Sequence, residues 1–174
     1  SKIRLSQFSG VSLDKYTTMI MVSGSYNQLS KNDIEKINDW VEKGNTLITV
    51  ANGSSWAINK KLVKETLLEA SNDSIFSRKN YVSAAENIGR ERIGGAILSV
   101  DLDLTHPLAF GYRDSSIPVY KNNNVFINKT KDHYSSVGIY SEDPHIDGYI
   151  SEENMKNNFK NTASLIVSKL GSGR

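Results

Sequence analysis

The stretch "GNTLITVANGSSWAIN", Gly44–Asn59, is typical of a helix end, a buried strand and a sharp turn into the next helix. Gly44 can adopt the left-handed backbone that stops a helix, and Leu47–Ala51 is an apolar run of the length of a strand buried on both faces. Because many α/β enzymes mount a nucleophile on such a strand-to-helix turn, the stretch raises the question of whether this turn carries one.

A strand and a helix are predicted just before this stretch. Met19–Val22 is a short apolar run closed by Ser-Gly-Ser, the pattern of another strand buried on both faces. Ser30 and Asp33 have the spacing of a capping box, and the residues that then recur at helical spacing are Ile34, Ile37, Trp40 and Val41. Strand, helix and strand in this order predict a right-handed parallel unit, in which ligands bind beyond the carboxyl ends of the strands.

Further elements are predicted along the rest of the chain. Helices are expected over 62–70, over 83–92 opening on Ser83 and Glu86, and over 151–160 with Ser151 as the cap, while "SNDS" at 71–74 is expected to turn. Strands are expected in "SSVGIYS" and "ASLIVSKL", and in "IGGAILSVDLDL", where the residues expected to face a sheet are Ile97, Val100, Leu102 and Leu104.

Turn residues indicate two further features. "IPVYKNNNVFIN" predicts a hairpin that turns at Asn122–Asn124, flanked by Val119, Tyr120, Val125 and Phe126. Pro107 suits a first helical position, and "GSGR" after the last predicted strand is turn chemistry.

Composition limits the class of protein. The 174 residues, 38% hydrophobic and 23% charged, suit one globular domain. The net charge of +2 comes from basic and acidic side chains spread along the whole chain, which argues against nucleic acid as a partner. The sequence has no apolar run of about 20 residues, so we expect no membrane span. With no cysteine there is no disulfide and no thiol chemistry.

Four segments together resemble the C-terminal domain of bacterial zinc carboxypeptidases, which belongs to the class I glutamine amidotransferase-like superfamily. They are "LDKYTTMIMVSGSY", "WVEKGNTLITVANGSSW", "RIGGAILSVDLDLTHPLAFGY" and "VGIYSEDPHIDGYI". The resemblance implies a flavodoxin-like three-layer α/β sandwich, with a mostly parallel sheet, helices on both faces and an added β-hairpin. It also implies a single domain over 1–174 that is part of a larger secreted or periplasmic protein, with edge strands outside this chain.

The register of the amidotransferase elbow can be placed on this sequence. Active members carry Gly-x-Cys-x-Gly, and the alignment puts Thr49 at the first glycine, Ala51 at the cysteine and Gly53 at the second glycine. A methyl group cannot attack a carboxamide, so the resemblance implies a catalytically silent domain. Ser54 and Ser55 lie just past the apex, where a hydroxyl is better placed to cap the next helix than to act as a nucleophile.

The three histidines do not form a site in the sequence. His145 with Asp147 loosely resembles the His-x-acid partner of an amidotransferase cysteine, but we expect His145 to be a surface-loop histidine, because no cysteine remains for it to activate. His106 is expected to fix a turn through its ring nitrogens, and His133 gives no signal beyond exposure. No histidine is followed by the Glu of a His-x-x-Glu zinc motif, so the zinc of the implied carboxypeptidase is expected in a separate peptidase domain, with no cofactor or metal in this one.

Three functions remain open at this point. The preferred one is a non-catalytic accessory domain whose partner is the peptidase domain of the same chain, with self-association through an open sheet edge as a further possibility. A serine-dependent hydrolase would use Ser54 or Ser55 with His145 and Asp147. A small carbohydrate- or peptide-binding module would use the residues beyond the strand ends, Gly24, Ser25, Tyr26, Asn52, Gly53, Ser54 and Trp56.

Overall fold

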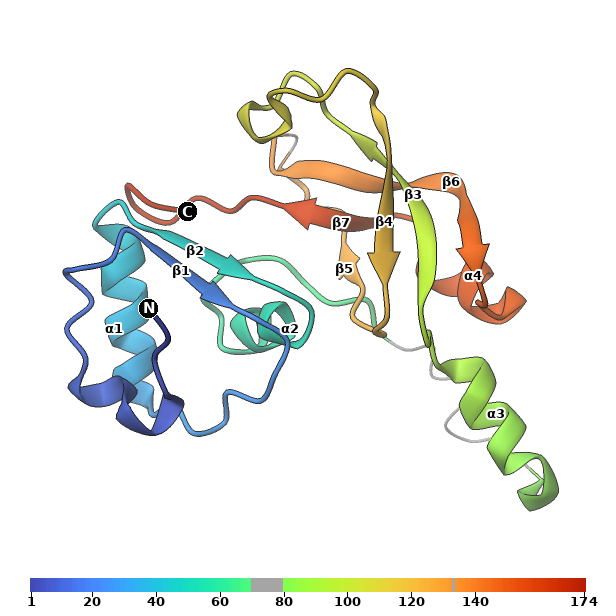
Figure 1. Ribbon diagram of the computed structural model, residues 1–174, viewed down its shortest axis with the longest axis horizontal. Helices are drawn as coiled ribbons and strands as arrows, with labels where there is room; N and C mark the ends of the chain where they lie inside the picture. The colour runs from blue at the N-terminus through green and yellow to red at the C-terminus, as the bar shows by residue number, and fades with distance from the viewer. Residues whose placement is uncertain (70–79, 133) are drawn as a thin grey trace. The chain divides into compact units, whose positions relative to one another are not determined.

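The chain contains two compact units, each with its own sheet and hydrophobic core. The computed structural model describes residues 1–69, 80–132 and 134–174 (Figure 1). The first unit comprises Ser1–Glu65 and Val167–Arg174, and the second comprises Thr66–Ile166. The first unit has a two-stranded sheet and the second a five-stranded sheet.

The first unit is built on the predicted strand-helix-strand segment. Strands β1 (Thr18–Met21) and β2 (Thr46–Thr49) are parallel, and helix α1 (Lys31–Glu42) connects them. Helix α2 (Asn52–Asn59) follows β2, and a 3-10 turn, η1 (Leu5–Gly10), precedes β1 (Figure 1). The parallel pairing of these two strands is therefore confirmed.

The start of α1 is fixed by the capping box that the sequence predicts. The Asp33 backbone N–H donates to Ser30 Oγ over 3.2 Å, and the Ser30 N–H donates to Asp33 Oδ2 over 2.9 Å. These bonds satisfy two donors that a helix start leaves unpaired. Past the helix end, Gly44 has φ of 107°, as predicted for the helix stop.

The two strands of the first unit are covered on one face only. Met21 packs in a core with Ile37 and Trp40 of α1 and Trp56 of α2. On the opposite face, Ile20 is 61% exposed and Ile48, its cross-strand neighbour, is 44% exposed. The prediction of strands buried on both faces is therefore wrong, because both helices contribute to the same core.

The end of the chain returns to the first unit. The Leu47 N–H donates to Arg174 O over 2.8 Å, and the Arg174 N–H donates to Asn45 O over 3.2 Å, so Arg174 runs beside β2. "GSGR" forms the predicted turn, in which the Leu170 N–H donates to Gly173 O. A Cβ at Gly173 would overlap Val41 O, so only glycine fits this turn.

The sheet of the second unit is antiparallel throughout. Its strand order is β4-β3-β6-β7-β5. The strands are β3 (Ala96–Leu102), β4 (Ser116–Lys121), β5 (Ile127–Asn128), β6 (Ser136–Gly148) and β7 (Thr162–Ile166) (Figure 1). The predicted flavodoxin-like sandwich with a mostly parallel sheet is therefore wrong: only β1 and β2 are parallel among the described residues.

The predicted hairpin at Asn122–Asn124 is also wrong. Strand β4 pairs with β3, placing Val119 opposite Leu98, and β5 pairs with β7. The asparagines at 122–124 allow the chain to reverse direction, but they do not determine which strands pair. The pairing of β4 with β3 is favoured by the burial of side chains on these two strands. Within β3, Ala96, Leu98, Val100 and Leu102 are buried, whereas Ile97 is exposed and Leu104 lies beyond the strand.

Two predicted helices form in the second unit. They are α3 (Ala84–Glu91), preceded by the 3-10 turn η3 (Tyr81–Ser83), and α4 (Glu152–Asn158). The Asn154 N–H donates to Ser151 Oγ over 3.2 Å, which confirms Ser151 as the cap of α4, whereas the Ser83 side chain makes no capping bond. Pro107 begins the 3-10 turn η4 (Pro107–Ala109), as predicted.

The helix expected over 62–70 and the strand expected in "SSVGIYS" differ from the structure, and the turn expected at 71–74 lies outside the described residues. Residues 62–69 form no helix, and Leu67 instead bridges to Ile127. Ala70 and "SNDS" lie outside the described residues. Strand β6 is longer than predicted and includes "DPHIDG". In the described residues, no helix is both long and apolar enough to cross a membrane.

Candidate functional site

The turn from β2 into α2 has a strained backbone at Ala51. Its φ of 50° and ψ of −113° fall in a region that L-amino acids rarely adopt. The carbonyl of Ala51 accepts the N–H of Ser54 over 2.9 Å and that of Ser55 over 3.2 Å, which starts the helix on this residue. The turn therefore reverses the chain within one residue and presents position 51 at the helix N-terminus.

Close packing of the turn on the end of β1 explains the glycine at position 53. A Cβ there would lie 2.7 Å from Met21 O and 3.2 Å from Val22 O. The Val50 N–H donates to the same Met21 O over 2.9 Å. Any larger residue would push α2 away from β1, so Gly53 fixes where the helix begins.

Ser54, one of the two serines weighed as a substitute nucleophile, makes a hydrogen bond within its own unit. Ser54 Oγ lies 3.0 Å from Thr49 Oγ1, and the two hydroxyls share a hydrogen bond. Ser54 and Ser55 are both half-buried on α2. Thr49 cannot act as a general base at neutral pH, so this contact positions a hydroxyl without activating it.

Tyr26 and Trp56 belong to the core of the first unit. Both are buried, with ring centroids 5.7 Å apart and the Tyr26 hydroxyl donating to Val22 O. Burial raises the pKa of the Tyr26 hydroxyl. Trp56 Nε1 is buried without a partner among the described residues. The other residues named for a ligand pocket, Gly24, Ser25 and Asn52, are exposed.

His145 and Asp147 both contact the backbone of Gly148 in the second unit. His145 Nε2 lies 2.6 Å from Gly148 O, and Asp147 Oδ1 accepts the Gly148 N–H over 2.7 Å. His145 is exposed, but it lies in β6 and not in a loop. Ser54 and Ser55 belong to the first unit, and His145 and Asp147 belong to the second.

The remaining histidines have separate positions. His106 Nδ1 accepts the Leu108 N–H over 3.1 Å, which confirms that its ring fixes the turn at η4. His133 lies outside the described residues. In the described ranges, no three His, Cys, Asp or Glu side chains are grouped so that they could hold a metal ion.

A buried lysine was not singled out in the sequence. Lys121 ends β4 and is only 5% exposed. Burial lowers the pKa of its ammonium to about 8. The alternation of residues along β4 could have predicted this burial, because Lys121 shares a face of the strand with the half-buried Ile117 and Val119.

Comparison of the chain with protein-family models, with curated proteins and with solved structures gives no match.

Proposed function

We propose that this chain is a catalytically silent accessory domain of a secreted or periplasmic zinc carboxypeptidase-like protein. The observation that carries the proposal is the alanine at the apex of the strained turn. In the proposed alignment Ala51 falls at the position of the nucleophile; it lies between β2 and α2 with a positive φ, and Gly53 packs against the end of β1. A methyl group has no lone pair and no acidic proton, so Ala51 itself cannot act as a nucleophile.

The serine-hydrolase alternative lacks support in the geometry. A nucleophilic serine needs a base within hydrogen-bond reach. Ser54 Oγ instead shares its hydrogen bond with Thr49 Oγ1, and His145 Nε2 lies against Gly148 O. The buried positions of Tyr26 and Trp56 likewise remove the aromatic wall on which the binding-module alternative depended.

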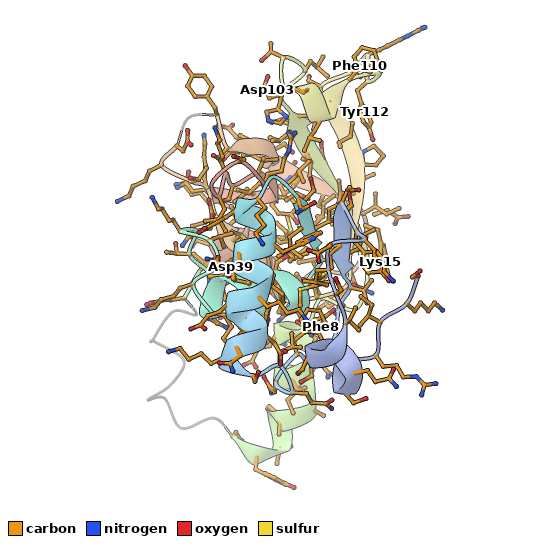
Figure 2. The ribbon with its side chains drawn as sticks, turned by 90° about the vertical axis from the view of Figure 1, so that its left-hand side faces the viewer. Phe8, Lys15, Asp39, Asp103, Phe110 and Tyr112 are labelled. Atoms are coloured by element: carbon orange, nitrogen blue, oxygen red, sulfur yellow. The ribbon has the colours of Figure 1, made fainter. Side chains whose placement is uncertain are left out.

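A role in binding a neighbouring domain is supported by the loop after β3. Phe110 is 94% exposed and Tyr112 is more than half exposed, and Figure 2 shows both on this loop. The loop is nevertheless held by its own bonds, because Asp103 Oδ1 accepts from the Thr105 N–H over 2.9 Å and from its Oγ1–H. Rigid, exposed aromatic side chains lose little entropy on binding and commonly anchor interfaces.

In this proposal the partner is the peptidase domain of the same protein, which would hold the zinc and perform the hydrolysis. Self-association of the first unit through the edge formed by β1 and the exposed face of the β1–β2 sheet is a second mode of contact. The first has the support of the exposed loop, and the second the support of an apolar face, Ile20 and Ile48, left uncovered within the first unit.

The test is hydrolytic activity of this chain beside its Ser54→Ala/Ser55→Ala double variant. Glutaminase, esterase and carboxypeptidase substrates are assayed with both proteins, after circular dichroism has shown that both are folded. The proposal predicts no turnover above background in either. Activity in the wild type that the double variant loses would establish a serine hydrolase and contradict the proposal.

A further inference from the structure

Lys121 carries its ammonium into the core of the second unit. Nζ donates to Val125 O over 2.6 Å and to Asn123 Oδ1 over 3.3 Å. Among the described residues, no carboxylate lies within 4 Å of the Lys121 ammonium. The ion pair found among them joins two other residues, Lys31 and Glu35. The charge is thus held by a carbonyl and an amide oxygen of the turn that follows its own strand.

Aromatic rings cover the rest of the ammonium. Nζ lies 4.4 Å from the centroid of the Phe126 ring and 6.0 Å from that of Tyr140 on β6. Phe159 packs edge-on against both rings. Among the described residues, Tyr140 is the titratable side chain that faces Lys121, and burial raises the pKa of its hydroxyl, which favours its neutral form. Ala96, opposite Lys121 on β3, has no charge.

The same turn also holds the end of α3. Asn124 Oδ1 accepts the Ile93 N–H over 3.1 Å, and Asn124 Nδ2 donates to Glu91 O. These bonds satisfy backbone groups at the point where α3 ends and the chain leads into β3. The turn at 122–125 therefore connects Lys121 on one side with the end of α3 on the other.

A second set of side chains holds this helix end from α4. Arg90 O accepts from Ser151 Oγ over 2.8 Å and from Asn154 Nδ2 over 2.7 Å. Opening of the 122–125 turn would thus release the bonds that Asn124 makes with the end of α3 and leave the bonds from Ser151 and Asn154 in place.

We propose that the 122–125 turn is a latch on the end of α3, and that the positive charge of Lys121 favours its opening. When the turn opens, Val125 and Phe126 leave the ammonium, which then regains water. A buried ammonium that has no counter-ion among the described residues gains more from hydration than it loses in two hydrogen bonds and two ring contacts. The neutral amine lacks this driving force and still donates to Val125 O.

The direction of the pH dependence follows from linkage. Burial lowers the pKa of Lys121 from 10.5 to about 8 in the closed turn, and opening restores the higher value. The open form therefore binds more protons between these two values, so raising the pH through this window closes the latch. From pH 7 to pH 9.5 the opening constant should fall roughly 10- to 30-fold.

Amide hydrogen exchange measured by NMR, corrected for the intrinsic rate at each pH, tests the latch. The reporters are the N–H groups of Val125, bonded to Asn123 Oδ1, and of Ile93, bonded to Asn124 Oδ1. Both should become more protected by the stated factor as the pH rises. The Ala109 and Tyr112 amides, bonded within the loop after β3, should not change in this way.

Three variants separate the latch from other effects. Lys121→Met should abolish the pH dependence at both reporters, and Lys129→Met, which changes an exposed lysine, should leave it intact. In Asn124→Ala, Val125 should keep the dependence, whereas Ile93 should exchange rapidly at every pH. Wild-type protection independent of pH would overturn the proposal. The same pH dependence of protection in Lys121→Met as in the wild type would also overturn it. A third contrary result would be that the reporter amides exchange only through global unfolding, at the rate seen for the Leu98 amide.

Discussion

Ala51 combines a costly backbone conformation with a side chain that makes no polar interaction. A residue other than glycine in this part of φ/ψ space costs about 1–3 kcal/mol and persists only where its surroundings enforce it. Here the enforcing contacts are the pairing of Val50 with Met21 and the packing of Gly53 beneath β1.

Replacing Ala51 by glycine should therefore stabilise the first unit. Relief of strain outweighs the greater entropy of the unfolded glycine, so we expect a gain of up to about 1 kcal/mol in the free energy of unfolding. Ala57→Gly is the matched control, because Ala57 is buried in α2 with no strain; it should lose about 1 kcal/mol or more. Urea denaturation followed by tryptophan fluorescence measures both. Equal losses in the two variants would show that Ala51 is not strained.

The structural role of some single residues could be predicted from the sequence, and that of others could not. The position of Ala51 at the strand-to-helix turn could be predicted, because Gly and Ser residues follow an apolar run there. The burial of Tyr26 and Trp56 could not, since residues at strand ends are equally compatible with a pocket wall and with a core. Lys121 was missed because a lysine is ordinarily taken as exposed.

At the scale of elements, local signals determined the helices better than the sheets. Helix α1 has a cap, an apolar stripe and a glycine stop within fifteen residues of sequence, and all three take effect in the structure. Strand pairing depends on residues far apart in the chain: β3 alternates clearly, but nothing local shows that its neighbours are β4 and β6.

The capping box of α1 gives a prediction at this scale. Ser30→Ala removes the acceptor of the Asp33 N–H and should cost about 1 kcal/mol of stability at pH 7. The Ser30 side chain is also the main cause that lowers the pKa of Asp33, so the variant should raise that pKa toward its ordinary value. Stability linked to Asp33 is present above its unfolded pKa and is lost as the pH falls through the folded one. Urea denaturation and an NMR titration of Asp33 measure the two effects.

Ser23→Ala serves as the control for the cap, because Ser23 is exposed after β1. It should change neither the stability nor the pKa of Asp33. A Ser30→Ala variant as stable as Ser23→Ala would mean that the capping box contributes nothing.

Only one face of the β1–β2 sheet packs against the core, so substitutions on its two faces should differ in their effect on stability. Met21→Ala removes a side chain from the core of the first unit and should cost about 2–5 kcal/mol. Ile20→Thr, at the adjacent position on the exposed face, should change stability by no more than about 0.5 kcal/mol. Denaturation curves of the two variants are compared directly. A large loss from Ile20→Thr would indicate that this face is covered in solution, by self-association or by other residues.

At the scale of the whole molecule, two separate cores suggest two units that unfold separately. The chain has two tryptophans, Trp40 and Trp56, and both lie in the first unit. Tryptophan fluorescence therefore follows that unit alone, whereas circular dichroism follows both. The single domain expected over 1–174 did not distinguish these units, because no proline- or glycine-rich linker marks the boundary at Glu65.

Leu98→Ala should reveal this independence. Leu98 is fully buried in the second unit, so its truncation should destabilise that unit by about 2–5 kcal/mol. The circular dichroism transition should shift to lower urea or split, while the fluorescence midpoint should stay within error of the wild type. Equal shifts of both signals would show that the two units unfold as one.

The measurement that tests the central claim most directly is the reactivity of a thiol placed at Ala51. The chain has no cysteine, so Ala51→Cys introduces a single reporter. At the N-terminus of α2 its thiolate should be stabilised, giving an alkylation pKa below the ordinary value of about 8.5. Asn59→Cys, at the opposite end of the same helix, is the control and should not show this fall. A lowered pKa at position 51 alone is the result that the account predicts for a turn that could activate a nucleophile but holds alanine. Equal, ordinary pKa values at both positions would contradict that account.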